Sequence, residues 1–315
     1  MKIKSVFVAA NLGLILMLLT ACSALKPTTT QPAPTAELPP ATGVEYYFVT
    51  NTLLLPTTQA QTKEFALNVD GDPQGNPDNK FGEMLTLLTS ASPGLELQSS
   101  LDQAINTGQL VTLHMVKAND PLNDTSVSWS IFLGQKSPSM PKFDGSDKFT
   151  IDTATPANSP IVGTLKDGHF SGGPGSAQVR MFLLGVPVDV KLIGVYLEAD
   201  VSAQGCTNGK LGGGLSVDEF RAKILPTITD GLNQIIKANQ SAATPLLTAF
   251  DSDQNGTITA QELENNPLLM LAVSPDLDLL DGSGKFNPNQ DGAKDSYSVG
   301  LGFTCVPATF TLPGD

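Results

Sequence analysis

Histidine, cysteine and tryptophan are scarce in this sequence, and the scarcity excludes several kinds of site. The 315 residues include 2 histidines, 3 cysteines and 1 tryptophan. A zinc site built from His and Cys ligands is therefore nearly excluded. Both histidines are expected at the surface, His114 on the polar side of a strand and His169 in a glycine-rich turn. One Trp and four Tyr are also few for stacking on sugars.

Basic residues are fewer than acidic ones, and familiar catalytic motifs are absent from the sequence. The chain has 18 Lys and Arg against 31 Asp and Glu, a formal net charge of -13. This balance argues against nucleic acid and against an anionic membrane surface as partners, and it favours divalent cations. No Gly-x-Ser-x-Gly, His-Glu-x-x-His or phosphate-loop motif occurs. We therefore do not expect an enzyme.

The first residues have the order of an export signal. Two lysines precede a mostly apolar run at 6–19, which is too short to span a membrane. The run ends in the tetrapeptide Leu19-Thr20-Ala21-Cys22. This tetrapeptide resembles the bacterial lipobox, and the resemblance implies removal of residues 1–21 and lipidation of Cys22. An ordinary secretory signal with a chance cysteine is the alternative.

Residues 22–43 are rich in Pro, Thr and Ala and predict an extended tether. The chain would then be held to a membrane through the lipid on Cys22. Ser23 is not an aspartate, which by the lipoprotein sorting pattern favours the outer membrane of the cell envelope. Residues 44–315 contain no second linker of this kind, so a single domain is expected there.

Alternating apolar residues predict that much of residues 44–315 is β-structure. Alternation is clear at 127–131, 111–115, 179–183 and 297–305, and it changes phase at Leu192-Ile193, where a β-bulge is expected. One apolar face per strand predicts antiparallel pairing. Helical signals lie at 97–105 and within about 214–274. The expected fold class is α+β, an antiparallel β-sandwich or sheet with a helical insertion.

Particular residues mark where the helices of the insertion should begin. Ser216 with Glu219 predicts a capping box. Pro226 fits the first turn of a second helix, and Thr244-Pro245 is expected to open a third, which ends at Phe250.

Cys206 and Cys305 are expected to form a disulfide. Two cysteines in an exported chain usually pair, because the compartment is oxidising. A bridge closing a loop of about 100 residues would stabilise the fold by up to about 4–5 kcal/mol in the chain-entropy model. Two separate thiols are the alternative.

The strongest functional signal is the twelve-residue stretch 251–262, Asp-Ser-Asp-Gln-Asn-Gly-Thr-Ile-Thr-Ala-Gln-Glu. It resembles the EF-hand calcium loop at every position. The resemblance implies that Gly256 allows the sharp turn, that Ile258 anchors the loop to the core, and that Ca²⁺ is bound by six residues. These predicted ligands are Asp251, Asp253, Asn255, Thr257 (through its backbone carbonyl), Thr259 and Glu262. The alternative is a solvated acidic turn.

The helix that leaves this loop departs from the EF-hand pattern. Pro267 follows Asn266 about one turn after Glu262, and proline cannot continue the helical hydrogen bonds. A long helix that swings open is therefore not expected, and this argues against a calcium sensor.

Two further segments are incomplete versions of the loop. The first contains Asp70, Asp72, Gln74, Asn76 and Asp78, and the second contains Asn287, Asn289, Asp291 and Asp295. Neither has a glutamate at position 12. They resemble the Asp/Asn-Gly calcium loops found between strands of exported proteins and are candidate second and third metal sites. Ordinary Asx turns are the alternative.

As a whole the chain resembles uncharacterised calcium-loop lipoproteins of Gram-negative bacteria, which implies a location and a metal but no activity. The function expected first is a calcium-stabilised binding or structural module of the envelope, with an unidentified protein or glycan partner. A calcium-dependent hydrolase with a carboxylate pair is the second hypothesis, and a calcium sensor is the third.

Overall fold

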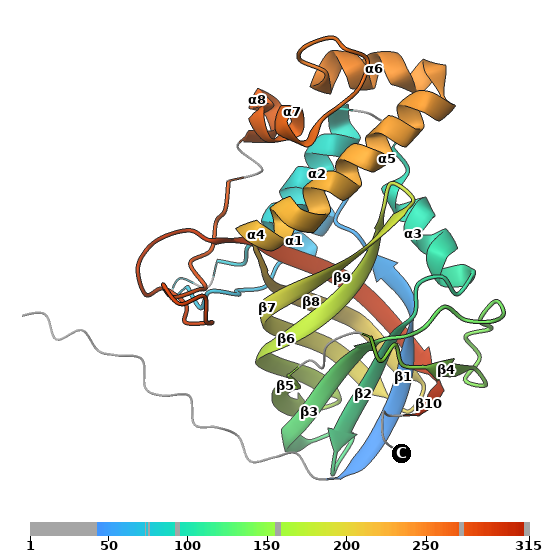
Figure 1. Ribbon diagram of the computed structural model, residues 1–315. Coiled ribbons are helices and arrows are strands. Elements are labelled where there is room, and N and C mark those ends of the chain that lie inside the picture. The colour runs from blue at the N-terminus through green and yellow to red at the C-terminus, as the bar shows by residue number, and fades with distance from the viewer. Residues whose placement is uncertain are drawn as a thin grey trace, which may run out of the picture. The chain divides into compact units, whose positions relative to one another are not determined.

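The computed structural model describes residues 43–72, 74, 76–91, 95–154, 159–270 and 274–311. All of them belong to one unit, Leu38–Asp315, whose arrangement is drawn in Figure 1. The predicted signal segment, the predicted lipidation site Cys22 and all of the tether but Gly43 lie outside the described residues. Within the described ranges no helix combines the length and the apolar character needed to cross a membrane.

Eight strands form a closed barrel, and every neighbouring pair is antiparallel. They follow one another around the barrel in chain order, and β9 closes it by pairing with both β8 and β1. The strands are β1 (Val44–Leu54), β2 (Thr112–Ala118), β3 (Asp124–Leu133), β5 (Ile161–Lys166), β6 (His169–Leu183), β7 (Val186–Ser202), β8 (Gly205–Ser216) and β9 (Ser296–Pro307).

The α+β class and the antiparallel sheet predicted from the sequence are confirmed, but the sheet does not split into a sandwich. It closes on itself. Alternation in a sequence shows only that one face of a strand is buried, and barrels and sandwiches both have such a face. Closure depends on which strand lies beside the first, and that pairing joins residues more than 250 positions apart, such as Thr50 and Cys305.

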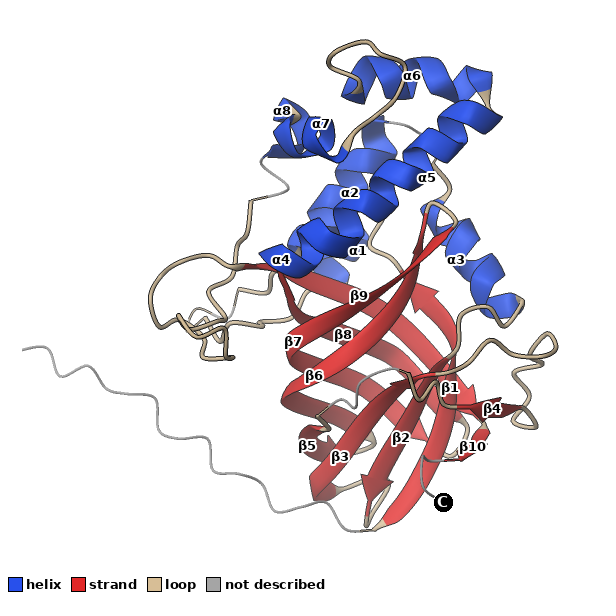
Figure 2. Cartoon of the chain, viewed as in Figure 1, coloured by secondary structure: helices blue, strands red, loops and turns tan. Residues whose placement is uncertain are grey.

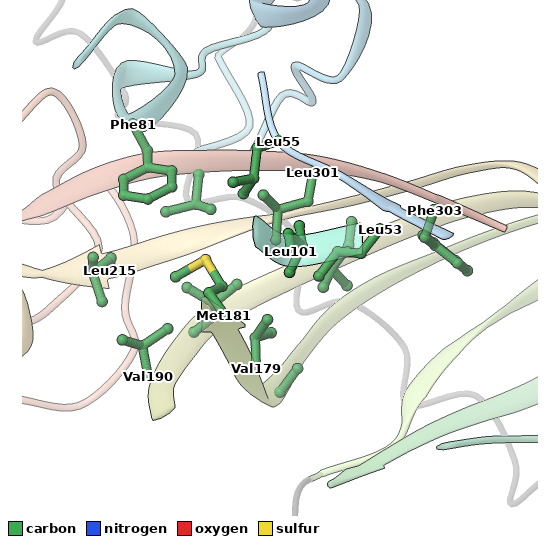
Figure 3. Packing of buried hydrophobic residues seen from close by; sticks show 14 of the residues in the cluster. Leu53, Leu55, Phe81, Leu101, Val179, Met181, Val190, Leu215, Leu301 and Phe303 are labelled. Carbon is green, nitrogen blue, oxygen red and sulfur yellow. The ribbon is translucent and has the colours of Figure 1, made fainter. Parts of the chain in front are cut away.

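Inward-facing residues of the strands fill the barrel. In β3, Val127 and Trp129 are fully buried and Ile131 is 3% exposed, as their alternation predicted. Helices contribute to the same hydrophobic cluster, through Phe81 and Leu101. Figure 3 shows these two side chains packed among residues of the strands. The interior is therefore a packed core shared by barrel and helices.

Strand β2 is buried on both faces, which overturns the prediction for His114. A parallel pair of short strands, β4 (Lys148–Thr150) and β10 (Thr309–Thr311), covers the outside of the barrel there. Leu113 packs in this outer cluster, so His114 faces inward and is only 3% exposed. The alternation predicted that the apolar residues of β2 point into the barrel. Leu113 instead points outward, where the outer layer of β4 and β10 buries it.

His114 is part of a buried polar contact inside the barrel. Its Nδ1 accepts a hydrogen bond from the Trp129 indole N–H (3.1 Å), so Nε2 carries the proton and donates to Thr50 Oγ1 (2.7 Å). Burial lowers the pKa of His114 to about 3. His169, in contrast, is exposed as predicted, and its Nδ1 lies 2.7 Å from Asp200 Oδ1.

The bulge predicted in strand β7 is present. The pairing of β7 with β6 shifts register between Val195 and Ile193, and Gly194 between them has φ +57°. Glycine adopts this left-handed backbone conformation at the least steric cost, because it has no Cβ. The bulge lets Leu192 and Val195 both point into the core, where each is fully buried.

The disulfide between Cys206 and Cys305 is confirmed. The two residues face each other across the β8–β9 pair, with their Cα atoms 4.8 Å apart. The bond spans 99 residues of sequence, a segment that includes every helix between these two strands. In the chain-entropy model this bond stabilises the fold by up to about 4–5 kcal/mol. It also holds β9, the strand that closes the barrel, to β8.

Two groups of helices gather at one end of the barrel, as Figure 2 shows. In the sequence, the first group comes between β1 and β2 and comprises α1 (Gln59–Glu64), α2 (Lys80–Ala91) and α3 (Leu97–Asn106). Of these, the sequence predicted only α3, whose Leu97, Leu101 and Ile105 are buried as expected.

The second group lies between β8 and β9 and corresponds to the predicted helical insertion. It comprises α4 (Val217–Glu219), η1 (Phe220–Ile224, a π-helical turn), α5 (Leu225–Ala238), α6 (Gln240–Phe250), α7 (Ala260–Asn265) and α8 (Pro267–Met270). Ser216 caps the first of them by accepting the Glu219 N–H, so the predicted cap is present; the Glu219 side chain accepts the Lys191 N–H. The predicted start of α6 is wrong. Asn239 caps it and Pro245 lies inside it, because the asparagine cap offers a better start five residues earlier.

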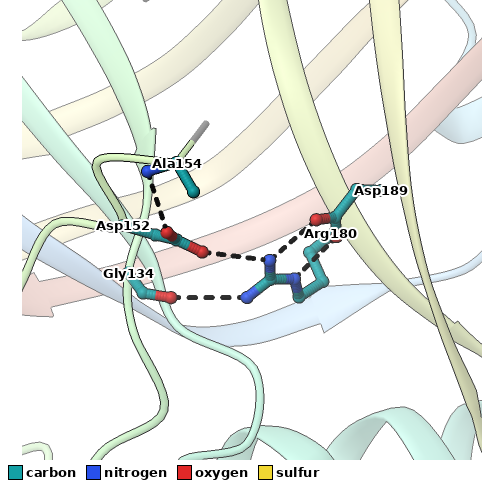
Figure 4. Close-up of polar contacts among 5 residues, drawn as sticks. All are labelled: Gly134, Asp152, Ala154, Arg180 and Asp189. Carbon is teal, nitrogen blue, oxygen red and sulfur yellow. Dashed lines mark hydrogen bonds and ion pairs between the residues drawn. The ribbon is translucent and has the colours of Figure 1, made fainter. Parts of the chain in front are cut away.

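An arginine on β6 ties three segments together on the barrel wall. Arg180 Nε and Nη2 donate to the two carboxylate oxygens of Asp189 at 2.6 and 2.7 Å. The same guanidinium reaches Asp152 and the carbonyl of Gly134, each at 3.4 Å, as Figure 4 shows. These hydrogen bonds join β6 and β7 to the residues that follow β3 and β4.

Candidate metal centre

The loop 251–262 connects α6 to α7 and is anchored by apolar residues at both ends. Phe250, the last residue of α6, is 2% exposed, and Leu263 in α7 is 1% exposed. Ile258, in the middle of the loop, is 1% exposed and belongs to the main hydrophobic cluster. The residues 252–257 between these anchors are exposed, whereas Asp251 is buried.

The loop brings three carboxylates together. One oxygen from each of Asp251, Asp253 and Glu262 lies within 4.8 Å of the other two. No other group of three acidic, His or Cys side chains in the described ranges converges in this way. Such a group of hard oxygen donors fits Ca²⁺, which takes six to eight oxygens, and offers no nitrogen or sulfur to a softer metal.

Hydrogen bonds from the loop backbone fix the first two of these carboxylates. Asp251, 9% exposed, accepts the N–H groups of Asn255 (3.1 Å) and Gly256 (2.8 Å). Gly256 has φ +85°, as its place in the turn requires. Asp253 accepts the Asn255 N–H at 3.1 Å and the Asn255 side-chain amide at 2.8 Å. The turn therefore positions both carboxylates before any ion arrives.

Glu262 returns from α7 to the start of the loop. Its Oε1 accepts the Ser252 N–H (2.7 Å), and its Oε2 accepts the Thr259 N–H and hydroxyl, both at 2.9 Å. Burial raises the pKa of Glu262, but the hydrogen bonds from Thr259, Asp253 and Ser252 outweigh it and lower the pKa to about 2. The carboxylate is therefore held ionised, as a cation ligand must be. Thr259 and Glu262 form a capping box at the start of α7.

The other predicted ligands of this loop lie beside the carboxylates. Asn255 Oδ1 accepts the Thr257 N–H at 2.9 Å. Thr259 Oγ1 accepts the Glu262 N–H at 3.2 Å and so serves the helix cap. The roles of all six residues as calcium ligands stay predictions.

A residue that the sequence did not reveal clamps the centre of the loop. Asn233 of α5 accepts the Ile258 N–H through Oδ1 (2.9 Å) and donates through Nδ2 to the Ile258 carbonyl (2.6 Å). Its side-chain amide thus satisfies both backbone groups of the residue at the middle of the loop. Asn233 lies 25 positions before Ile258 on a separate helix, so no local pattern could have pointed to it.

A second asparagine fixes the two helices relative to each other. The side chain of Asn266, just after α7, donates to the carbonyl of Ala249 near the end of α6 (2.7 Å). Pro267 follows directly and begins α8. The two arms of the loop are therefore joined at the loop's base, which limits how far α7 can swing.

The first incomplete loop is arranged as a series of turns. Asp70 accepts the Asp72 N–H (3.0 Å), and Asp72 accepts the Gln74 N–H (2.8 Å) and the Asn76 side-chain amide (2.9 Å). Asp78 pairs instead with Leu67 through the backbone. These side chains do not converge as the carboxylates of 251–262 do.

The charge around Asp78 is nevertheless strongly negative. Burial, the largest cause, together with the neighbouring carboxylates of Asp276, Asp70 and Asp72 raises its pKa to about 6, against the opposite effect of Lys294. Asp276 is itself partly buried and accepts the Ser298 N–H at 2.8 Å and the Ser298 hydroxyl. The segment around Asp276 therefore lies close to the first incomplete loop.

The second incomplete loop uses its acids to stabilise its own backbone. Asp295 accepts the Leu280 N–H (2.9 Å) and the Ser296 hydroxyl (2.7 Å). Asp291 accepts the Ala293 N–H at 2.8 Å. Asn289 instead reaches the first incomplete loop, by donating to the Asp70 carbonyl at 2.7 Å. Asn287 donates its backbone N–H to the Leu279 carbonyl at 2.8 Å, and its role as a metal ligand stays a prediction.

Comparison with known proteins found no matching family model, no matching curated protein and no matching solved structure.

Proposed function

We propose that this chain is a calcium-binding lipoprotein of the cell envelope, and that its loop 251–262 is an EF-hand loop in which Ca²⁺ serves a structural role. The observation that carries the proposal is the convergence of Asp251, Asp253 and Glu262 within 4.8 Å on a loop anchored in the core. Glu262 and Asp251 lie at opposite ends of this loop. An ion shared by them would join α6 to α7.

The surroundings of the loop support a structural ion over a sensor. Asn266 bridges the two helices at the base of the loop, and α7 ends after six residues. A sensor needs a helix pair that opens to expose an apolar groove. Here the Phe250, Ile258 and Leu263 side chains belong to the core of the whole unit, so opening would disrupt that core.

A hydrolase with a carboxylate pair is less well supported. Asp78 beside Asp276 provides a carboxylate with a raised pKa next to a second one. Ser298, however, donates hydrogen bonds to both oxygens of Asp276, so that carboxylate is committed to the fold. The acids of loop 251–262 are likewise oriented towards one another and the backbone.

A calcium titration by calorimetry, with parallel thermal melts, tests the proposal. Structural sites of exported proteins bind Ca²⁺ with a Kd of about 10⁻⁴–10⁻³ M. At about 100 times Kd, binding to the folded state alone adds about 2.7 kcal/mol, which corresponds to a rise of roughly 5–10 °C in Tm. No heat of binding and an unchanged Tm would refute the structural role. Tight binding with altered apolar exposure and little change in Tm would favour a sensor.

The proposed membrane anchor is tested separately. Replacing Cys22 with Ser removes the acyl acceptor, so the protein should no longer incorporate a labelled fatty acid or sediment with membranes. Separation of the two membranes then tests the outer-membrane assignment. Unchanged sedimentation of the Cys22→Ser protein would contradict lipid anchoring at this residue.

A further inference from the structure

Two acidic segments far apart in the sequence meet beside the barrel. The Asn289 side chain donates to the Asp70 carbonyl at 2.7 Å, which joins residues 219 positions apart. In Figure 1 the blue segment around Asp70 and the red segment around Asn289 lie side by side. An apolar cluster lies at the base of both segments, formed by Leu67, Val69, Leu277 and Leu279.

A buried carboxylate lies within this junction. Asp278 is 1% exposed. Its Oδ2 accepts the Gly292 N–H at 2.7 Å, and its backbone carbonyl accepts the Asn289 N–H at 2.9 Å. Its Oδ1 is buried and has no hydrogen-bond partner among the residues that the structure describes.

The contact between Asp278 and Gly292 matches the one at the candidate metal centre. There, Asp251 Oδ2 accepts the Gly256 N–H at 2.8 Å, and here Asp278 Oδ2 accepts the Gly292 N–H at 2.7 Å. Gly256 and Gly292 have φ +85° and +75°. Each glycine follows an Asn or Asp in an acidic loop. Asp278, not Asn287, therefore has the place that Asp251 has in the first loop.

An unpaired oxygen on a buried carboxylate is costly unless the charge is neutralised. A proton would neutralise one charge, but other carboxylates, of Asp70, Asp72 and Asp78, lie in the adjoining segment, close enough to one another to interact. A divalent cation would offset more of this charge. The junction also supplies further hard oxygens, including the Asn289 amide, which suits calcium.

We propose that Asp278 is a ligand of a second calcium site, formed where the loop 287–292 meets the segment around Asp70. This site is separate from the loop 251–262 and is assembled from two distant segments of the chain. Bound calcium would join the segment before α2 to the segment before β9, the strand that closes the barrel. The site would therefore form only in the folded protein.

Calorimetric titration of the full chain with CaCl₂ tests this site in a Glu262→Gln background, where the first loop is disabled. We expect binding of one Ca²⁺ per chain to remain, and Asp278→Asn to remove it. Asparagine keeps an oxygen for the Gly292 N–H and removes the charge, so the metal-free Tm should not fall. Asp281→Asn is the matched control. Asp281 lies in the same segment but is partly exposed and accepts the backbone N–H groups of Ser283 and Lys285, so this change should leave binding intact.

The outcomes separate the two sites. If Glu262→Gln abolishes all binding, the second site is refuted and the first stands. If binding survives Asp278→Asn unchanged, Asp278 is not a ligand and the proposed site is refuted. If circular dichroism shows that the Asp278→Asn chain is unfolded, Asn289→Ala is measured in its place. The same loss of one Ca²⁺ is then expected, and retained binding would refute the site.

Discussion

The loop 251–262 and the incomplete loops 70–78 and 287–295 contain the same kinds of residue but use them differently. In the first, carboxylates from both ends of one short segment converge, and Glu262 provides the closing contact. In the other two, no three carboxylates of the described residues converge in this way, although the acids there also accept hydrogen bonds from backbone groups. The comparison teaches that similar composition does not by itself bring carboxylates together.

The largest effect is expected from removing Glu262, the proposed ligand at the far end of the loop 251–262. Glu262→Gln takes away a charge and the bidentate contact at position 12, so calcium affinity of the loop should fall by more than about 100-fold, beyond the loss typical of outer-shell changes. Calorimetry measures the loss. Glu264→Gln, two residues on and paired only with Arg221 at the surface, is the control and should bind like the parent. Equal affinity of the Glu262→Gln protein would refute the ligand assignment.

The same substitution in two loops sharpens the comparison further. Asp253→Ala should greatly weaken calcium binding, because Asp253 is one of the three converging carboxylates. Asp72→Ala removes an acid at the equivalent place of loop 70–78, but one that accepts only the Gln74 N–H and the Asn76 amide. It should leave the number of bound Ca²⁺ ions unchanged. Equal losses in both proteins would contradict the difference between the loops.

A smaller effect is expected at Asn233, which contacts no ion. Asn233→Ala frees both backbone groups of Ile258, so the loop should be less well ordered and calcium affinity should fall by about 10-fold, the lower end for supporting residues. Asn233→Asp keeps the acceptor for the Ile258 N–H and should lose less. Equilibrium titration with a calcium chelator measures both. An unchanged affinity for Asn233→Ala would show that α5 does not position the loop.

The smallest effect is expected in how the stability of the calcium-free protein depends on pH. The pKa of Asp78 rises from its ordinary value of 3.8 to about 6, because burial and nearby carboxylates favour the protonated form. The folded state therefore holds this proton more tightly than the unfolded state, and stability should decrease as pH rises from about 4 to about 6. Asp78→Asn should remove this part of the pH dependence, measured by melts in chelator.

Glu262 should act in the opposite sense in the same experiment. Its pKa is lowered to about 2, so its contribution to stability is present above its ordinary value of 4.5 and is lost as pH falls towards 2. The two carboxylates thus define separate pH windows. A single shared transition for Asp78→Asn and Glu262→Gln would contradict the different environments assigned to the two regions.

The parts of the fold that the sequence predicted depend on local patterns. The inward sets of β3, β6 and β9 followed from alternation, and the cap at Ser216 followed from a four-residue motif. His114 was misplaced because alternation identifies an apolar face but not the layer that covers it. The start of α6 was misplaced because a favourable asparagine cap at Asn239 outweighed the proline signal.

The residues of the candidate sites also divide into those that local patterns predicted and those that they did not. Asp251, Asp253 and Glu262 were predicted because all of them belong to one turn of twelve residues, whose geometry is set by Gly256 and the cap at Thr259. Asn233 was not identified as a contributor to its loop, because it acts on backbone groups of another segment. A contact across segments leaves no spacing in the sequence to detect.

By itself, the sequence determined which segments become strands, the loop that gathers three carboxylates, and the two cysteines available to pair. Short-range sterics and hydrogen bonding are enough for the strands and the loop, because the residues involved are neighbours in the chain. Only the tertiary structure decided that the sheet closes through β9, that His114 lies inside, and that Asn289 meets the segment around Asp70. Those outcomes depend on burial between distant segments, which form together only when the whole core packs.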